Sequence, residues 1–271
     1  MPAATLTLHD RPLVEAEPAK GLARWITLQR PDVHNAFNEV VIKELTQAIM
    51  DAGAENSVKA LVLAAEGPSF SAGADLAWMA KMTTYSQAEN EADARGLYSL
   101  LNTLRHSAKP TLARVQGNAF GGGVGLIAAC DMAVALESCR FGLTEVKLGL
   151  IPAVISPVVI EAIGPRQARW LFQTGELFDA PAALRMGLCH AVVSDETALD
   201  GWITKRLGYI AANGPVAMHD AKELVFAVNH SQPSDYERLT TQWIARRRAS
   251  AEGKEGTAAF LEKRSPVWPT E

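Results

Sequence analysis

Cysteine is scarce in this sequence, and none of it has a spacing typical of metal or redox sites. Three cysteines, Cys130, Cys139 and Cys189, occur among 271 residues, an odd number without paired motifs. No cluster of His, Cys and Asp has the spacing of metal ligands. The sequence therefore predicts free thiols in a reducing compartment, no disulfide and no metal site.

Long hydrophobic runs and an excess of positive charge are also missing. The apolar stretches near Val124–Ala129 and Ile151–Ile160 are too short for a membrane span. The 26 basic and 30 acidic residues give a formal charge of −4, and the basic cluster Arg246–Arg248 is typical of a solvated helix face. The acidic N-terminus lacks the pattern of a signal or transit peptide. We expect a cytoplasmic protein with neither nucleic-acid nor membrane partners.

Short, strand-like segments predict a sheet. With 48% hydrophobic residues, the chain can bury a large core. Strands are predicted at Ala23–Leu28, Ala60–Ala64, Thr111–Val115 and Met132–Leu136. The continuous apolar run Ala60–Ala64 is typical of a parallel strand that is covered on both faces.

Helical patterns lie between these strands. Asn38 is a candidate N-cap, and one buried stripe is predicted at Val41, Leu45, Ala48, Ile49 and Ala52. A further helix is predicted from about Gln87 to Leu104. A separate short helix is predicted after the Gly-rich turn and ends at about Ala129. The alternation of strand and helix favours an α/β fold with a mostly parallel sheet. After Ser156 helices are expected to dominate.

Two turns contain small residues. Phe70–Leu76 (FSAGADL) follows the second predicted strand, and Asn118–Gly125 (NAFGGGVG) follows the third and opens a helix. Bare N–H groups at a helix N-terminus stabilise a developing anion. Close packing of the helix on the strand is the alternative reason for the glycines. A dinucleotide site is excluded because the GxGxxG spacing is absent.

One carboxylate lies in an apolar segment. Glu145 belongs to Phe141–Pro152 (FGLTEVKLGLIP). Desolvation there should raise its pKa toward the range that serves general acid/base catalysis. The alternative is a structural ion pair with Lys147 or with a distant arginine.

Taken in order, these segments resemble the crotonase (enoyl-CoA hydratase/isomerase) superfamily. The likeness begins at Ile26–Pro31 (ITLQRP) and Asn35–Phe37 (NAF), continues through FSAGADL, FGGGVGL and FGLTEVKLGLIP, and ends at Glu255–Arg264 (EGTAAFLEKR). It implies a spiral of ββα units over residues 1–200, which holds the CoA and acyl site. Residues 201–271 would form a C-terminal helical trimerisation subdomain. The resemblance also implies homotrimers or hexamers, a substrate carried as a coenzyme A thioester, and no tightly bound cofactor.

The resemblance assigns roles to individual residues. The backbone N–H groups of Ala72 and Gly122 would form an oxyanion hole, and Glu145 would move protons. The CoA-binding set would include Phe260 and Lys263, one helical turn apart on one face and covering the CoA of a neighbouring subunit. The other members of that set would be Ala36, Ala72, Gly73, Ala74 and Asp75.

One position departs from the familiar two-glutamate hydratases. Gly125 stands where the first glutamate would be, so hydratase and enoyl-CoA isomerase both remain open. The motifs look most like bacterial methylglutaconyl-CoA and isohexenylglutaconyl-CoA hydratases of leucine and acyclic terpenoid breakdown, which also carry glycine there. This favours reversible syn hydration of a branched glutaconyl-type 2-enoyl-CoA. The other alternative, a catalytically silent acyl-CoA-binding protein, is disfavoured because Glu145 is retained.

A glutaconyl-type substrate carries a second carboxylate, which needs a cation or a hydrogen-bond donor near the far end of the acyl pocket. Lys81 and Arg95 lie in the segment that shapes acyl pockets in this family. Both also fit ordinary exposed helix charges, so neither is assigned to the site.

Overall fold

Two sheets form the body of the protein in the computed structural model, which describes residues 5–15, 17 and 20–269. The larger sheet contains, in spatial order, β1 (Leu6–Pro12), β2 (Leu22–Leu28), β3 (Val58–Ala65), β5 (Thr111–Val115), β7 (Met132–Leu136) and β10 (Ala191–Val193). The smaller sheet contains β4 (Ser69–Ser71), β6 (Asn118–Phe120), β8 (Arg140–Gly142) and β9 (Leu177–Asp179). Of the strand pairs among the described residues, only β1–β2 and β8–β9 are antiparallel, which confirms the mostly parallel sheet.

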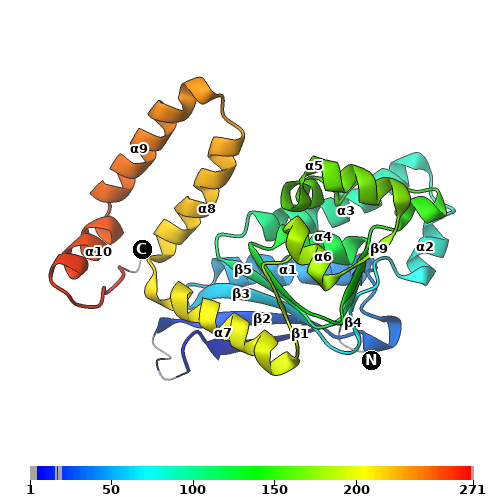
Figure 1. Cartoon of the computed structure of the whole chain (residues 1–271), viewed down its shortest axis with the longest axis horizontal. Coiled ribbons are helices and arrows are strands. Elements are labelled where there is room, and N and C mark those ends of the chain that lie inside the picture. The colour runs from blue at the N-terminus through cyan, green and yellow to red at the C-terminus, as the bar shows by residue number, and fades with distance from the viewer. Residues whose placement is uncertain (1–4, 16, 18–19, 270–271) are drawn as a thin grey trace.

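The chain winds as a spiral of ββα units. The pairs β3–β4, β5–β6 and β7–β8 each place one strand in each sheet, and helices follow every pair (Figure 1). The helices of the body are α1 (Glu39–Ala54), α2 (Leu76–Met82), α3 (Gln87–Arg105), α4 (Gly122–Ala129), α5 (Ser156–Thr174), α6 (Ala180–Met186) and α7 (Glu196–Ala212). The predicted α/β class and spiral of ββα units are confirmed.

Helix α1 shows how local sequence sets these elements. The Asn38 side chain caps it by accepting a hydrogen bond from Val41 N–H at 3.0 Å, as predicted. The buried face comprises Val41, Ile42, Leu45, Ala48, Ile49 and Ala52. The predicted stripe therefore packs against the core, with Ile42 added to it.

Both faces of the larger sheet are covered. Along β3, Leu61 and Leu63 belong to the apolar cluster shared with α1, α3, α4 and α5, whereas Ala60 and Val62 belong to the cluster shared with α7. This alternation explains why β3 is apolar from Ala60 to Ala65. The predicted boundary between residues 200 and 201 falls inside α7, which packs on the sheet.

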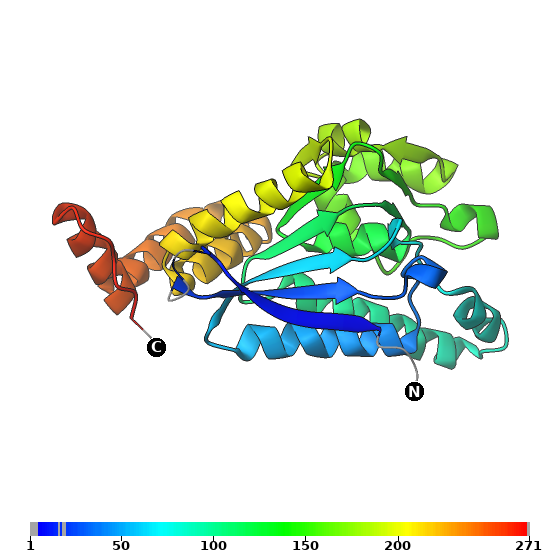
Figure 2. The same cartoon turned by 90° about the horizontal axis from the view of Figure 1, so that it is seen from below.

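The last three helices project from the body as an arm (Figures 1 and 2). The arm comprises α8 (Pro215–Asn229), α9 (Tyr236–Ala249) and α10 (Ala251–Leu261). Neither α8 nor α9 contains a buried residue. In this chain their apolar side chains therefore lack the cover that the body helices have.

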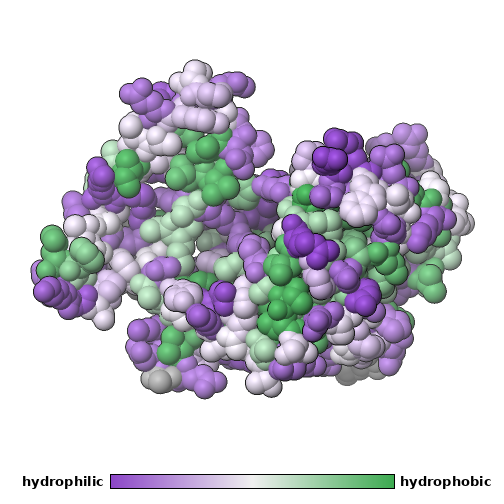
Figure 3. All heavy atoms as spheres, in the orientation of Figure 1, coloured by the Kyte–Doolittle hydropathy of each residue, from purple (hydrophilic) through white to green (hydrophobic). Residues whose placement is uncertain are grey.

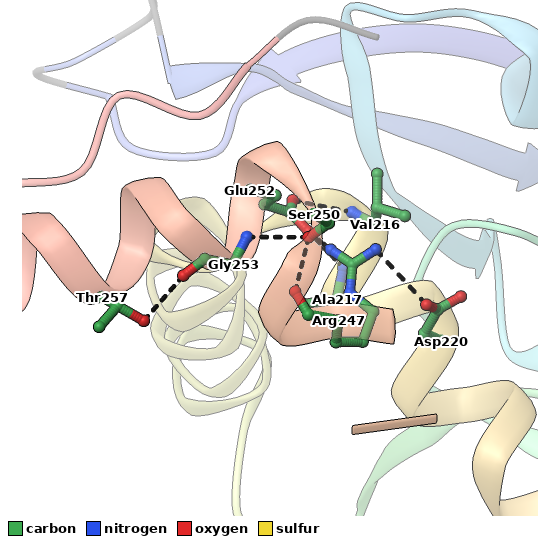
Figure 4. Close-up of polar contacts among 8 residues, drawn as sticks. All are labelled: Val216, Ala217, Asp220, Arg247, Ser250, Glu252, Gly253 and Thr257. Atoms are coloured by element: carbon green, nitrogen blue, oxygen red, sulfur yellow. Dashed lines mark hydrogen bonds and ion pairs between the residues drawn. The ribbon is translucent and has the colours of Figure 1, made fainter. Parts of the chain in front are cut away.

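A single buried carboxylate joins the three arm helices (Figure 4). Glu252 of α10 is only 3% exposed. It accepts hydrogen bonds from Val216 N–H at 3.0 Å and Ala217 N–H at 2.8 Å, at the N-terminus of α8. It also pairs with Arg247 of α9, which lies 3.5 Å from Asp220 of α8. Glu252 thus fixes the geometry of the arm.

Candidate active site

The first small-residue turn, Ala72–Asp75, connects β4 to α2 and lies against β6. Gly73 has φ 89°, and a Cβ there would lie 3.1 Å from Phe120 O. Asp75 ends the turn, where its side chain accepts a hydrogen bond from Ala77 N–H at 2.9 Å and caps α2. The backbone conformation and the close contact together require glycine at position 73.

The hydrogen bonds of this turn change the expected assignment of donors. Ala72 N–H donates to His34 O at 2.9 Å, so it is not free to bind an oxyanion. The predicted role of Ala72 conflicts with this bond. Ala74 N–H has no acceptor within the part of the chain that the structure describes. Ala74, expected only in the CoA-binding set, is therefore the residue of this turn with an available donor.

The second turn opens α4. Gly121, with φ 49°, precedes the helix, and the N–H of Gly122 at its first position has no acceptor among the described residues. A Cβ on Gly122 would lie 2.8 Å from the Phe37 ring, and one on Gly123 would lie 2.7 Å from Ser71 O. Close packing therefore requires glycine here, and the same geometry leaves a helix-terminal N–H unbonded.

Glu145 lies beside the second turn, at the start of a short 3-10 helix, Glu145–Leu148. A Cβ on Gly121 would lie 3.1 Å from Glu145 Oε1. Glu145 Oε2 is buried without a hydrogen-bond partner in the described structure. Burial raises the pKa of Glu145, and a hydrogen bond from its own backbone N–H opposes this only in part. Among the described residues no cation pairs with it, so the expected alternative of a structural ion pair is not observed.

Position 125 is closed to a larger side chain. A Cβ on Gly125 would lie 2.6 Å from Ile155 Cγ2 and 3.6 Å from Leu101 Cδ1. Ile155 and Leu101 are each 2% exposed and belong to the main core. The place where a second glutamate was considered is therefore filled by apolar groups, and Glu145 is the carboxylate beside the second turn.

The predicted CoA-binding residues are divided between two distant places. Ala36 and Asp75 lie near the first turn, where Arg30 bonds to both. Phe260, 81% exposed, lies on α10 at the far end of the arm (Figures 1 and 2). Helix α10 ends at Leu261, and Lys263 has φ 56°, so the expected shared helix face is wrong. Within one chain these two groups are not brought together.

The two cations considered for a distal substrate carboxylate already have carboxylate neighbours. Lys81 Nζ lies 2.7 Å from Glu39 Oε1, and Arg95 lies 3.9 Å from Glu91. All four side chains are exposed. Both cations therefore have the surroundings of ordinary surface charges.

A cavity of about 740 Å³ lies elsewhere, between the arm and the body. Figure 3 shows the surface hollowed between these two parts. Its lining includes Cys130, His190, Lys222 and Phe226, and it contains neither Ala74 nor Glu145. This cavity is distinct from the site formed by the two turns.

The cysteines are free in the structure. Burial raises the pKa of Cys139 to about 11 and that of Cys189 to about 12, so both are protonated at neutral pH. Within residues 5–15, 17 and 20–269, no three His, Cys, Asp or Glu side chains gather to hold a metal ion. No helix in that part of the chain is long and apolar enough to cross a bilayer.

Comparisons of the sequence and of the fold with known proteins all point to one family. The family described as enoyl-CoA hydratase/isomerase matches residues 19–271. A Thermus thermophilus relative that bears the name of an enoyl-CoA hydratase is 36% identical over 91% of this chain and 97% of its own length. The crotonyl-CoA hydratase of Syntrophomonas wolfei is 31% identical over 88% and 90%, respectively. The crystal structure of an enoyl-CoA hydratase from Shewanella pealeana is 40% identical, with a TM-score of 0.92 over 98% of this chain and 97% of that one.

Proposed function

Because the chain belongs to the enoyl-CoA hydratase/isomerase family, within the crotonase superfamily, we propose that its two turns and Glu145 add water to a branched 2-enoyl-CoA thioester. Its class of enzyme is enoyl-CoA hydratase, the name that its relatives carry. The proposal concerns the residues that act and the acyl group that they accept.

In the proposed reaction, Ala74 N–H and Gly122 N–H bind the thioester oxygen. Glu145 removes a proton from water while the water oxygen bonds to C3, and the electron pair of the double bond moves toward the carbonyl. The two N–H groups stabilise the negative charge that develops on that oxygen. Glu145 then returns the proton to C2 on the same face, so atoms and charge balance. Because Gly122 is the first residue of α4, the positive end of that helix dipole also stabilises this negative charge.

The observation that carries the proposal is the buried, unpaired oxygen of Glu145. A carboxylate that served only the fold would be expected to have a hydrogen-bond or ion-pair partner. Glu145 Oε2 has none among the described residues, and burial raises the pKa of the group. A carboxylate with these properties exchanges protons near neutral pH more readily than an exposed one.

The proposed substrate is a glutaconyl-type thioester such as 3-methylglutaconyl-CoA. The support is the likeness of the motif segments to hydratases of this type, together with glycine at position 125. Ile155 Cγ2 lies where a side chain at position 125 would begin, so one glutamate must take and return the proton. The same single carboxylate favours enoyl-CoA isomerisation as the second candidate, because one base can move a proton along the acyl chain.

We further propose that copies of this chain assemble as a trimer or hexamer and share their sites. Phe260 and Lys263 belong to the expected CoA-binding set, yet Phe260 lies on α10 and Lys263 just after it, in the part of the arm that extends away from the body (Figures 1 and 2). A neighbouring copy could bring them to the turns. The uncovered faces of α8 and α9 support the same arrangement.

A hydration assay tests the function. Purified protein is mixed separately with 3-methylglutaconyl-CoA and crotonyl-CoA, and loss of the conjugated enoyl-thioester absorbance is followed for wild type and Glu145→Gln. We expect rapid loss with the branched diacid, slower loss with crotonyl-CoA, and loss of activity in the variant. If the protein converts a 3-enoyl-CoA but hydrates neither substrate, its function is enoyl-CoA isomerisation instead of hydration. Tight acyl-CoA binding without either reaction would indicate a silent binding protein.

A further inference from the structure

Ala74 lies between two hydrogen bonds made by one neighbouring residue. Phe37 N–H donates to Gly73 O at 2.7 Å, and Asp75 N–H donates to Phe37 O at 2.8 Å. Phe37 and Ala74 thereby form an isolated parallel bridge. In such a bridge one residue bonds the residues before and after its partner, so the partner's own N–H points to the opposite side. The direction of Ala74 N–H is therefore set by how Phe37 is held against the turn.

Arg30 connects the two segments of this bridge. Its guanidinium donates from Nη1 to Ala36 O at 2.6 Å and from Nη2 to Asp75 Oδ2 at 3.0 Å. Ala36 precedes Phe37, and Asp75 follows Ala74. The Arg30 and Asp75 side chains are 21% and 13% exposed, so their pair is better shielded from water than a surface ion pair.

The backbone of Arg30 is itself anchored. Its N–H donates to Asn35 Oδ1 at 2.8 Å. Asn35 is 1% exposed, and its Nδ2 donates to Glu66 O and Ser69 O, both at 2.8 Å. Asp75 is fixed at the other end because it caps α2. The guanidinium therefore bridges two points that are each held by the body.

We infer that Arg30 is a positioning residue, which aims Ala74 N–H at the thioester oxygen by holding Phe37 against the turn. The inference rests on the proposed function, in which Ala74 is one of the two oxyanion donors. Within the described structure Arg30 makes no hydrogen bond or ion pair with Glu145 or Gly122. Its effect on the reaction therefore passes through Ala74, and loss of Arg30 should lower kcat more than it raises KM.

A pair that served only stability would behave differently, and the chain offers a matched control. Arg24 of β2 and Asp10 of β1 form a similar pair, with Nη2 to Oδ2 at 3.0 Å and side chains 18% and 32% exposed. Neither residue belongs to the two turns. Replacing Arg24 removes a comparable ion pair without changing the surroundings of Ala74.

The experiment compares full-length wild type, Arg30→Gln, Arg30→Lys and Arg24→Gln. Each protein is saturated with 4-(dimethylamino)cinnamoyl-CoA, whose electron-rich ring is conjugated to the thioester. Its absorption moves to longer wavelength as the carbonyl oxygen accepts stronger hydrogen bonds. Steady-state hydration gives kcat and KM for 3-methylglutaconyl-CoA or crotonyl-CoA, whichever wild type hydrates faster. Circular dichroism reports whether each variant folds.

We expect wild type and Arg24→Gln to give the same shift of the probe. Arg30→Gln should give a smaller shift and a kcat lower by about 100-fold, because a misaimed catalytic donor has that order of effect. Arg30→Lys, which keeps the charge without the two-pronged geometry, should lie between them.

Four results distinguish the ways in which these expectations can fail. A folded Arg30→Gln with wild-type shift and kcat would overturn the inference, and so would an equal loss in Arg24→Gln. If Arg30→Gln does not fold, Arg30→Lys takes its place in the test. Wild-type probe shift and kcat in Arg30→Lys would then overturn the inference, and a smaller shift with a lower kcat would support it. If wild type itself neither hydrates a substrate nor shifts the probe, the proposed function fails, independently of any variant.

Discussion

Replacing Glu252 with glutamine should open the arm while the body stays folded. Glu252 is 3% exposed, accepts two helix-terminal hydrogen bonds, and pairs with Arg247. Loss of a helix cap costs about 1 kcal/mol, and breaking a buried pair costs about 3–5 kcal/mol. Glutamine keeps one acceptor, and Arg247 keeps Asp220 at 3.5 Å, so the lower part of that range applies. The free energy that holds the arm helices together is expected to fall by about 3 kcal/mol. This raises the equilibrium constant for opening of the arm by a factor on the order of 100.

Hydrogen–deuterium exchange followed by mass spectrometry measures this opening. Amides in the first turn of α8 should lose protection by that factor, whereas those of β3 and β5 should not change. Glu255→Gln is the control on the same helix. Glu255 bonds Arg264 and Val267 N–H, so its replacement should affect only the end of the chain. Unchanged protection of α8 in Glu252→Gln would refute this reasoning, as would equal loss throughout the body.

Four further predictions concern the catalytic and CoA-binding residues. Glu145→Gln should lower kcat by about 10²–10⁴-fold. Because burial raises the Glu145 pKa above the ordinary 4.5, the folded state binds this proton more tightly than the unfolded chain. Stability therefore falls as pH rises through the raised pKa, and urea titrations should show wild type losing stability relative to Glu145→Gln only above pH 4.5. Gly125→Glu should lower the free energy of unfolding by about 3 kcal/mol through overpacking against Ile155 and burial of charge, and a double-mutant cycle with Ile155→Ala should recover part of it. Phe260→Ala should raise KM roughly tenfold with little change in kcat, measured by steady-state hydration.

The central strands were predictable because their signals are local. Thr111–Val115 and Met132–Leu136 match β5 and β7 residue for residue. Each is a short, mainly apolar segment in the sheet, and Arg114 is the one charged residue in these two strands. Strand β1 was not predicted, because His9, Asp10 and Arg11 make it polar. It exists through antiparallel pairing with β2, a partner that its own sequence does not reveal.

Features of the site could be predicted from the sequence only where a single segment of the chain determines them. The apolar surroundings of Glu145 in sequence indicated a raised pKa, and its direction agrees with the structure. The choice between Ala72 and Ala74 as donor depends on His34 O, which lies far away in the sequence and takes the Ala72 N–H. The sequence around Glu252 did not indicate its burial either, because that burial depends on the N-terminus of α8.

The contact between Gly125 and Ile155 also constrains how this sequence could evolve. Glutamate introduced first at position 125 meets the Ile155 methyl group, so the intermediate is overpacked. A smaller residue introduced first at position 155 leaves a cavity in the core, at about 2–5 kcal/mol for alanine. Either order passes through a less stable protein, and the benefit of one change depends on the other. Forms with one and two carboxylates are therefore separated by an epistatic barrier, and selection can hold the lineage on the single-carboxylate side.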